Sequence, residues 1–170
     1  GANGTGSQSI WAQSFSTWGV TANFPETSGV KSYPNISMDV NKTVSSLRQV
    51  DSSFDVSVPG SGSWATAYDI WVDNNAYEIM LWMNRNGQVG PIAEAYDANG
   101  AVPAVSDLAV GGHTWNVYRG SNGSNQVFSF IQDNATSGEV DILEILNWLR
   151  TEGWLNSGSV LGKVQFGYEI

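Results

Sequence analysis

The chain has no cysteine and only one histidine, His113, among its 170 residues. Without cysteine it can form neither a disulfide bond nor a thiolate metal site. One histidine is too few for the multi-histidine zinc sites of hydrolases. No apolar run approaches the ~18 residues that a membrane-spanning helix needs. We therefore expect no metal, no organic cofactor and no membrane segment.

Charge is scarce in this chain and mostly negative. Charged residues make up 14% of the sequence, and 16 Asp and Glu outnumber 7 Lys and Arg, for a formal net charge of −9. Nucleic acids and anionic membranes bind basic patches, so neither is expected as a partner. A neutral ligand is compatible with this composition.

Glycine and aromatic residues are plentiful, with 19 Gly and 8 Trp. Apolar residues alternate with period two between clusters of turn residues, which indicates many short strands. Strands are predicted at 18–24, 30–33, 53–58, 64–73, 76–84, 114–118, 127–131 and 163–170, with a turn-rich stretch at 86–112. One helix is predicted between an N-cap at Ser137 and a stop at Gly153. We expect one all-β domain over 1–170, a two-sheet antiparallel sandwich with one α-helix.

Two of these strands place a glutamate on the face opposite their apolar residues. In the segment Tyr77–Trp82, Glu78 is expected to share a face with Met80, Trp82 and Asn84, because alternate strand residues point to opposite sides. In the last segment, Glu169 likewise opposes an apolar face. Glycosidic bond hydrolysis uses two flanking carboxyl groups, which such a pair could supply. The alternative interpretation is that both glutamates are solvated strand residues.

The pair Asn74–Asn75 predicts a tight hairpin turn, because asparagine tolerates positive φ. With a two-residue turn, Trp71 lies opposite Glu78 and Asp69 lies opposite Met80. Asp69 is then diagonal to Glu78, within reach of its carboxylate. A one-residue slip would scramble the apolar face, which supports this register.

Several segments together resemble glycoside hydrolase family 12 over most of the chain. They are Val30-Lys-Ser-Tyr-Pro-Asn35, Ala67-Tyr-Asp-Ile-Trp71, Tyr77-Glu-Ile-Met-Leu-Trp82, Gly112-His-Thr-Trp115, Leu146-Asn-Trp-Leu149 and Gln165-Phe-Gly-Tyr-Glu-Ile170. The resemblance implies a β-jelly roll, a concanavalin-like sandwich, whose concave face binds a β-1,4-linked glucan. It also implies a secreted enzyme that needs no cofactor, and we expect a monomer.

By the same resemblance, Glu78 is the expected nucleophile, Glu169 the acid/base, and Asp69 the carboxyl group that hydrogen-bonds the nucleophile. The expected substrate-binding residues are Trp82, Met80, Trp71, Lys31, Pro91 and Asn134. Each has a structural alternative: Trp82 could fill a gap in the sheet, Lys31 could be a solvated edge residue, and Pro91 a plain loop proline.

The expected activity is endo-hydrolysis of β-1,4-glucosidic bonds in cellulose and related β-glucans, with retention of configuration. The alternatives are a xyloglucan- or mixed-linkage-specific glucanase of the same family, or a non-catalytic jelly roll that binds glucan. A binding module has no use for Asp69, Glu78 and Glu169 together, so the carboxyl groups favour the hydrolase.

The family pattern includes strands beyond both ends of the printed sequence, so we expect a domain truncated at both ends. The sequence stops one residue after Glu169. A terminal carboxyl group is expected to be frayed and solvated, in which case burial would not raise the pKa of Glu169.

Overall fold

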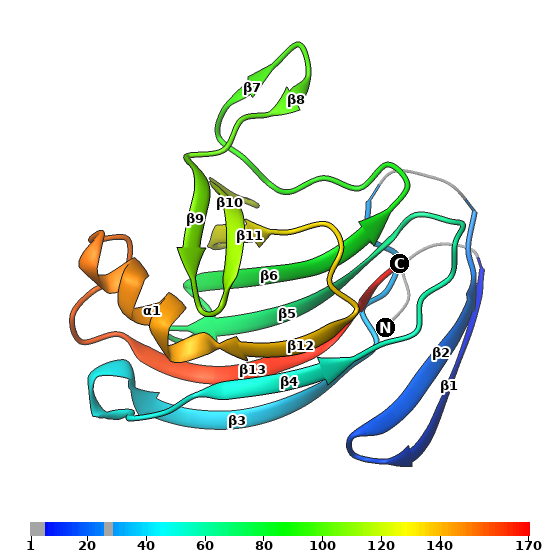
Figure 1. Cartoon of the computed structure of the whole chain (residues 1–170), viewed down its shortest axis with the longest axis horizontal. Coiled ribbons are helices and arrows are strands. Elements are labelled where there is room, and N and C mark those ends of the chain that lie inside the picture. Colours follow the sequence, from blue (N-terminus) through cyan, green and yellow to red (C-terminus); the bar gives the residue numbers. More distant parts are fainter. Residues whose placement is uncertain (1–5, 26–28) are drawn as a thin grey trace.

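The computed structural model describes residues 6–25 and 29–170, and most of them lie in strands (Figure 1). The strands alternate apolar and polar residues and are separated by Gly, Asn and Asp turns, as a β-sandwich requires. Thirteen strands, one short 3-10 helix and one α-helix follow in chain order: β1 Ser7–Ser14, β2 Thr17–Asn23, β3 Asn35–Thr43, η1 Val44–Ser46, β4 Asp51–Asp55, β5 Trp64–Val72, β6 Tyr77–Asn86, β7 Tyr96–Asp97, β8 Gly100–Ala101, β9 Val105–Val110, β10 His113–Ser121, β11 Gln126–Ile131, β12 Ser137–Asp141, α1 Ile142–Thr151 and β13 Val160–Glu169.

The main sheet has seven strands in the order β3-β13-β5-β6-β11-β10-β9. Adjacent strands of this sheet run antiparallel with one exception, which is the parallel pair β11 and β6. After β6 the chain crosses to the far edge of the sheet before β9, β10 and β11 return toward it. Such a crossover, unlike a tight hairpin, allows parallel pairing. The expectation of a wholly antiparallel sheet is therefore corrected at this one pair.

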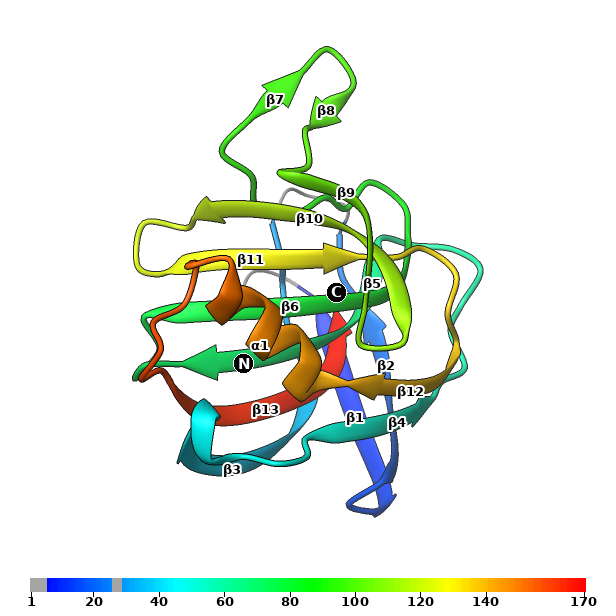
Figure 2. The same cartoon turned by 60° about the vertical axis from the view of Figure 1, so that its left-hand side comes forward.

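A second layer covers one face of the main sheet. It consists of the β12–β4 pair and α1, which lie side by side across the sheet in both views (Figures 1 and 2). The main core lies between the two layers and includes Tyr68, Trp115 and Phe130, together with Ile145 and Leu149 of α1. The opposite face of the main sheet, away from α1, is called the open face below. The β1–β2 and β7–β8 hairpins project from the body (Figure 1).

The predicted helix exists but begins later than expected. Residues 137–141 form β12, which pairs with β4, so the chain stays extended up to Asp141. Asp141 is the N-cap, and its carboxylate accepts a hydrogen bond from the backbone N–H of Glu144 at 3.0 Å. The predicted N-cap at Ser137 is wrong, whereas Gly153, with φ +74°, follows the end of the helix as expected. Within the described residues no helix has both the length and the apolarity needed to cross a bilayer.

The predicted hairpin register is confirmed: Asp69 lies opposite Met80 and Trp71 opposite Glu78. A bulge follows, because Ala67 pairs with Trp82 but Thr66 pairs with Asn84, which leaves Met83 unpaired. Such a bulge shifts the later side chains to the other face. Asn84 consequently bonds Thr66 and Ala135 away from the open face. The expectation that Asn84 shares a face with Glu78 is wrong.

Residues 30–33 do not form the predicted strand. The strand β3 instead begins after Pro34, at Asn35, and pairs with β13. The stretch before it crosses the end of β13 in an irregular conformation, with backbone hydrogen bonds to Tyr168 and Ile170. This irregular stretch places Tyr33 beside the carboxyl groups described next.

Candidate active site

Three carboxyl groups lie on three neighbouring strands of the open face. Glu169 is on β13, Asp69 on β5 and Glu78 on β6, and β5 lies between the other two strands. Asp69 and Glu78 are diagonal neighbours, as the hairpin register predicts. On β5 the preceding open-face residues are Ala65 and Ala67, both small and fully buried. The sequence alternation therefore predicts correctly that these three acids share a face.

Asp69 is the most enclosed of the three, with 6% of its surface exposed. Burial raises the pKa of Asp69 to about 9, and the charge of Glu78, a hydrogen bond to Glu78 and the charge of Glu169 add to that rise. Lys163 acts weakly in the opposite direction. Below this pKa Asp69 keeps its proton, so its O–H donates to the Glu78 carboxylate. The buried oxygen Asp69 Oδ1 accepts no hydrogen bond from an N–H or O–H donor among the described residues.

Glu169 is also shielded from water, contrary to the expectation of a frayed end. Burial, together with the negative charge of Glu78, raises the pKa of Glu169 to about 7. The last strand is held on both sides, because Glu169 pairs with Ala65 of β5 and the Ile170 backbone bonds Lys31 and Ser32. The expectation of a solvated acid with no shift from burial is therefore wrong.

Glu78 receives a second hydrogen bond, from a residue that the sequence analysis did not select. Asn125 Nδ2 donates to Glu78 Oε2 at 3.2 Å. Asn125 lies in the turn between β10 and β11, and the parallel pairing of Gln126 with Tyr77 brings that turn to Glu78. No local pattern in the sequence reveals this contact, because the two residues are 47 positions apart in the chain.

The two glutamates thus face different surroundings. Glu78 accepts hydrogen bonds from two donors, Asp69 and Asn125. Glu169 has a raised pKa and holds a proton near neutral pH. A carboxylate and a carboxylic acid within electrostatic range of each other are the pair that glycoside hydrolysis requires.

Met80 and Trp82 lie on the open face but are covered. They expose 6% and 3% of their surfaces and pack with Ala65, Ala67, Val127 and Ile131. The loop after β6 closes over them, with Val89 and Ile92 against the cluster. This burial corrects the expectation of an exposed sugar platform and favours the alternative, in which Trp82 fills a gap.

Trp71 is the expected aromatic residue that stays partly accessible next to Glu78. It lies between Lys163 of β13 and Glu78 of β6 in one row across the sheet. Its Nε1 donates to Gln165 Oε1 at 3.2 Å, and the Lys163 ammonium lies 5.8 Å from the indole ring. The indole is therefore fixed in orientation by two polar neighbours.

The remaining expected residues lie around the rim. Lys31 is half-buried, and its Nζ donates to the carbonyl of Gly29 at 2.9 Å. Pro91 is half-buried in the loop that covers the open face, where Ile92 and Ala93 lie so close to Gly120 that a side chain there would be crowded. Asn134 is exposed and forms an isolated bridge with Asn84. The structure brings Lys31 to the end of β13 but leaves Asn134 on the surface.

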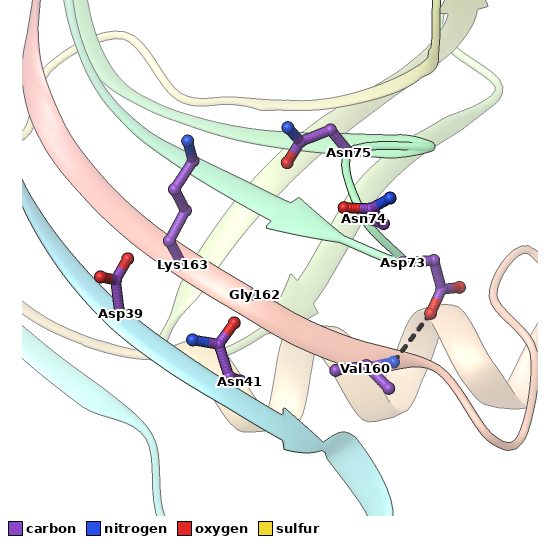
Figure 3. A pocket seen from close by; sticks show the side chains of 8 residues that line it. All are labelled: Asp39, Asn41, Asp73, Asn74, Asn75, Val160, Gly162 and Lys163. Carbon is purple, nitrogen blue, oxygen red and sulfur yellow. Dashed lines mark hydrogen bonds between the residues drawn. The ribbon is translucent and has the colours of Figure 1, made fainter.

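A polar hollow opens at Lys163, the β13 partner of Trp71, with α1 behind the strands (Figure 3). Asp39 and Asn41 come from β3, Lys163 from β13, and Asp73 and its neighbours from the hairpin turn. Asp73 has a structural role, because its carboxylate accepts hydrogen bonds from the Val160 N–H at 2.8 Å and the Ser159 hydroxyl at 2.9 Å. The hollow is an additional polar surface, between β3, β13 and the β5–β6 turn, that no sequence pattern indicated.

Within residues 6–25 and 29–170, no three His, Cys, Asp or Glu side chains are placed to hold a metal ion. His113 instead contacts Gln132 and the Glu139 carbonyl oxygen, so it links β10 to β12.

Comparison with known proteins gives a consistent result. The family model described as glycosyl hydrolase family 12 matches residues 2–170. The xyloglucan-specific endo-beta-1,4-glucanase A of Emericella nidulans is 33% identical over 150 residues, which is 84% of this chain and 60% of that protein. The chain therefore spans about three fifths of the length of such curated relatives.

Solved structures agree with the fold. The xyloglucanase domain of NopAA, a type three effector from Sinorhizobium fredii, in complex with cellobiose, has a TM-score of 0.92 and 39% identity; the match covers 97% of this chain and 78% of that one. The native family 12 xyloglucanase from Bacillus licheniformis has a TM-score of 0.80 and 29% identity, covering 96% and 78%. These comparisons confirm the expected β-sandwich of jelly-roll type.

Proposed function

Because the chain belongs to glycosyl hydrolase family 12, we propose that it cleaves internal β-1,4-glucosidic bonds of glucans by a retaining mechanism. The observation that carries the proposal is the set of three carboxyl groups on β13, β5 and β6, two of which have raised pKa values. A solvated polar strand face would not hold three acids this close together. The alternative of two unrelated surface glutamates therefore has less support.

In the proposed first step, Glu78 attacks the anomeric carbon while Glu169 gives its proton to the departing glycosidic oxygen. The C–O bond breaks, and a covalent glycosyl–Glu78 ester forms. In the second step Glu169, now a carboxylate, takes a proton from water as the water oxygen attacks the anomeric carbon, and the ester bond to Glu78 breaks, which releases the sugar and restores the Glu78 carboxylate. Two inversions give net retention, and both glutamates return to their starting protonation states.

Asp69 and Asn125 have supporting roles in this proposal. Both donate hydrogen bonds to Glu78. The bond from Asp69 orients the nucleophile, and it weakens as negative charge leaves Glu78 in the glycosylation step. Trp71, Lys31 and Pro91 are proposed to contact sugar units along the open face, with Asn134 as a distal contact. Met80 and Trp82 shape the floor from beneath.

The proposed substrate is a neutral β-1,4-glucan, and xyloglucan is the second candidate. Relatives named as xyloglucan-specific glucanases and a xyloglucanase domain with a TM-score of 0.92 favour the branched polymer. The polar hollow at Lys163 leaves space beside the proposed glucan-binding surface of the open face for a side branch. Polysaccharides of this kind do not enter cells, so we propose that the protein acts outside the cell, as a monomer and as one catalytic domain.

The test is release of reducing ends from tamarind xyloglucan, carboxymethyl cellulose and mixed-linkage β-glucan, with viscosity measured in parallel. An endo-acting enzyme lowers viscosity early, before many reducing ends appear. Glu78→Gln is the matched control, because it removes the nucleophile and keeps the shape. Binding to all three polymers with no cleavage of any would support the non-catalytic jelly roll instead.

A further inference from the structure

The segment 31–34 holds the end of β13 on both sides of Glu169. The N–H groups of Lys31 and Ser32 donate to the Ile170 carbonyl oxygen at 2.7 and 3.3 Å, and the Ile170 N–H donates back to Ser32 at 3.1 Å. On the other side of Glu169, the Tyr168 N–H donates to the Pro34 carbonyl oxygen at 3.1 Å. Since the backbone is fixed at both neighbours, Glu169 cannot swing away with a loose strand end.

Tyr33 lies in the middle of this segment, and its side chain reaches across β13 to β5. Its hydroxyl donates to the Ala67 carbonyl oxygen at 2.9 Å. Ala67 lies at the β6 bulge, where the regular ladder is interrupted. Gly167, the β13 partner of Ala67, has no room for a side chain, because Pro34 and Asn35 lie directly against it. The missing side chain at Gly167 allows segment 31–34 to pass this close.

The phenol of Tyr33 lies within electrostatic reach of all three acids. Burial raises its pKa well above 10, and the charges of Asp69, Glu169 and Glu78 raise it further, in that order. The phenol is therefore neutral at any working pH. A neutral ring beside carboxyl groups displaces water without adding a positive charge, which disfavours their ionised forms.

The other charged groups near the carboxyl cluster lie on β5, β6, β13 and the segment 31–34. Asp69 on β5 and Glu78 on β6 are the acids. The cations are Lys31 beside Tyr33, Arg85 on β6 in the row of Ala65 and Glu169, and Lys163 on β13, which acts on Asp69. The Arg85 guanidinium is engaged with Asp133 at 2.7 Å, and the Lys31 ammonium with the Gly29 carbonyl. Tyr33 is the uncharged side chain among these groups.

We propose that Tyr33 is a positioning residue for the reaction, which seals the carboxyl cluster from water and so keeps Glu169 protonated for acid catalysis. The proposal rests on the roles assigned above to Glu78 and Glu169. The hydrogen bond to Ala67 holds the ring in place, and the ring excludes water. The hydroxyl and the ring thus have separable effects, which two substitutions can distinguish.

The experiment titrates the Glu169 carboxyl carbon by ¹³C NMR in protein labelled at glutamate, with the signal assigned from Glu169→Gln. Tyr33→Ala is expected to lower the midpoint of that titration by about one pH unit, because water returns to the cluster. Tyr33→Phe keeps the ring and is expected to lower it less. The basic limb of kcat/KM against pH should move down by the same amounts. Tyr118→Ala, which removes another half-buried tyrosine from the open face, is the control for cavity formation.

An unchanged Glu169 midpoint in folded Tyr33→Ala would overturn the proposal and leave Tyr33 a purely structural contact, visible only as a lower Tm. If Tyr33→Ala does not fold, Tyr33→Leu is used, and the same criterion applies. The titration needs no substrate, so it separates the two proposals. A shifted midpoint without glucanase activity would contradict only the proposed function. An unshifted midpoint with normal loss of activity in Glu78→Gln would contradict only the role of Tyr33.

Discussion

Chemically similar carboxyl groups behave differently here because of what surrounds each of them. Asp69 has neighbouring negative charges and little water, so it keeps its proton at neutral pH. Glu78 is the acceptor for two hydrogen bonds, one of them from Asp69. Glu169, which is shielded from water and lies within reach of the Glu78 charge, has a pKa of about 7. An acid with a pKa near the working pH can both donate and retrieve a proton, which a two-step hydrolysis requires.

The assignment of nucleophile and acid makes opposite predictions for the two glutamates. Glu78→Ala should abolish cleavage of every glucan, and added azide should then yield a glycosyl azide of inverted configuration. Glu169→Ala should still cleave aryl glycosides with activated leaving groups, because these need no proton. The measurement is product analysis by NMR. Equal loss of aryl-glycoside cleavage in both variants would show that the roles are misassigned.

Asp69 should influence rate more than binding. Asp69→Asn keeps a hydrogen-bond donor toward Glu78 but removes the ionisable proton, and kcat should fall by ~10²–10⁴ if that proton shifts in the transition state. KM should change little, since Asp69 is buried beneath the substrate surface. Steady-state kinetics from about pH 4 to 9 provide the check. A pH profile and kcat equal to those of the unmodified protein would remove Asp69 from the mechanism.

What the sequence could predict at this scale was the set of residues that share a face. Strand alternation places Asp69, Glu78 and Glu169 together, since each lies on a regular stretch. Asn125 could not be found in this way, because it reaches Glu78 through a parallel pairing between distant strands. The burial of Trp82 was equally hidden, because it depends on how the loop carrying Val89 and Ile92 folds back.

At the scale of elements, irregular positions decide where the site forms. The unpaired Met83 ends the regular alternation of β6, so that Trp82 is the last residue of that strand to follow the pattern set by Glu78. Periodicity cannot reveal such a bulge, because one extra residue looks like any other in the sequence. Residues 30–33, which the sequence pattern predicts as a strand, are irregular, and the backbone hydrogen bonds of segment 31–34 with Tyr168 and Ile170 place Tyr33.

Gly167 offers a test of that irregular stretch. Gly167→Ala would place a methyl group against Pro34 and Asn35, so we expect a loss of ~1–3 kcal/mol in unfolding free energy from overpacking. The segment should loosen, and the basic limb of the pH profile should move down as Glu169 meets water. Gly158→Ala is the matched control, because a methyl group there has no neighbour within 4 Å. Denaturant unfolding and pH–rate profiles of both variants give the answer, and equal behaviour of the two would count against the close approach.

At the scale of the whole molecule, the fold class followed from the sequence while the strand order did not. Turn residues and alternation predict a sandwich with one helix, and the structure has both. The order β3-β13-β5-β6-β11-β10-β9 depends instead on long-range pairing. That order places β5 between the two strands that carry the glutamates. Strand pairing of this kind has no local signature, since it is decided by the packing of the complete chain.

The same strand order predicts how the stability of the whole protein depends on pH. Asp69 and Glu169 have folded-state pKa values of about 9 and about 7, raised mainly by burial. In the unfolded chain both would titrate near ~4. Between those limits the folded state binds more protons than the unfolded state, so unfolding free energy falls as pH rises. The contribution of Glu169 is lost by about pH 7 and that of Asp69 by about pH 9.

Thermal unfolding at about pH 5 and about pH 8 checks this prediction. The Tm of the unmodified protein should be lower at the higher pH, because two buried carboxyl groups must then ionise or remain protonated at a cost. Glu169→Gln should flatten the dependence below about pH 7, and Asp69→Asn should flatten the part that continues toward pH 9. Both amides remain neutral, so each variant should exceed the unmodified protein in Tm at the alkaline end. Gln126→Asn, on an exposed strand end, controls for substitution without loss of a carboxyl group. Parallel Tm curves for all four proteins would mean that these acids are solvated, and the low-water cluster proposed for acid catalysis would then be wrong as well.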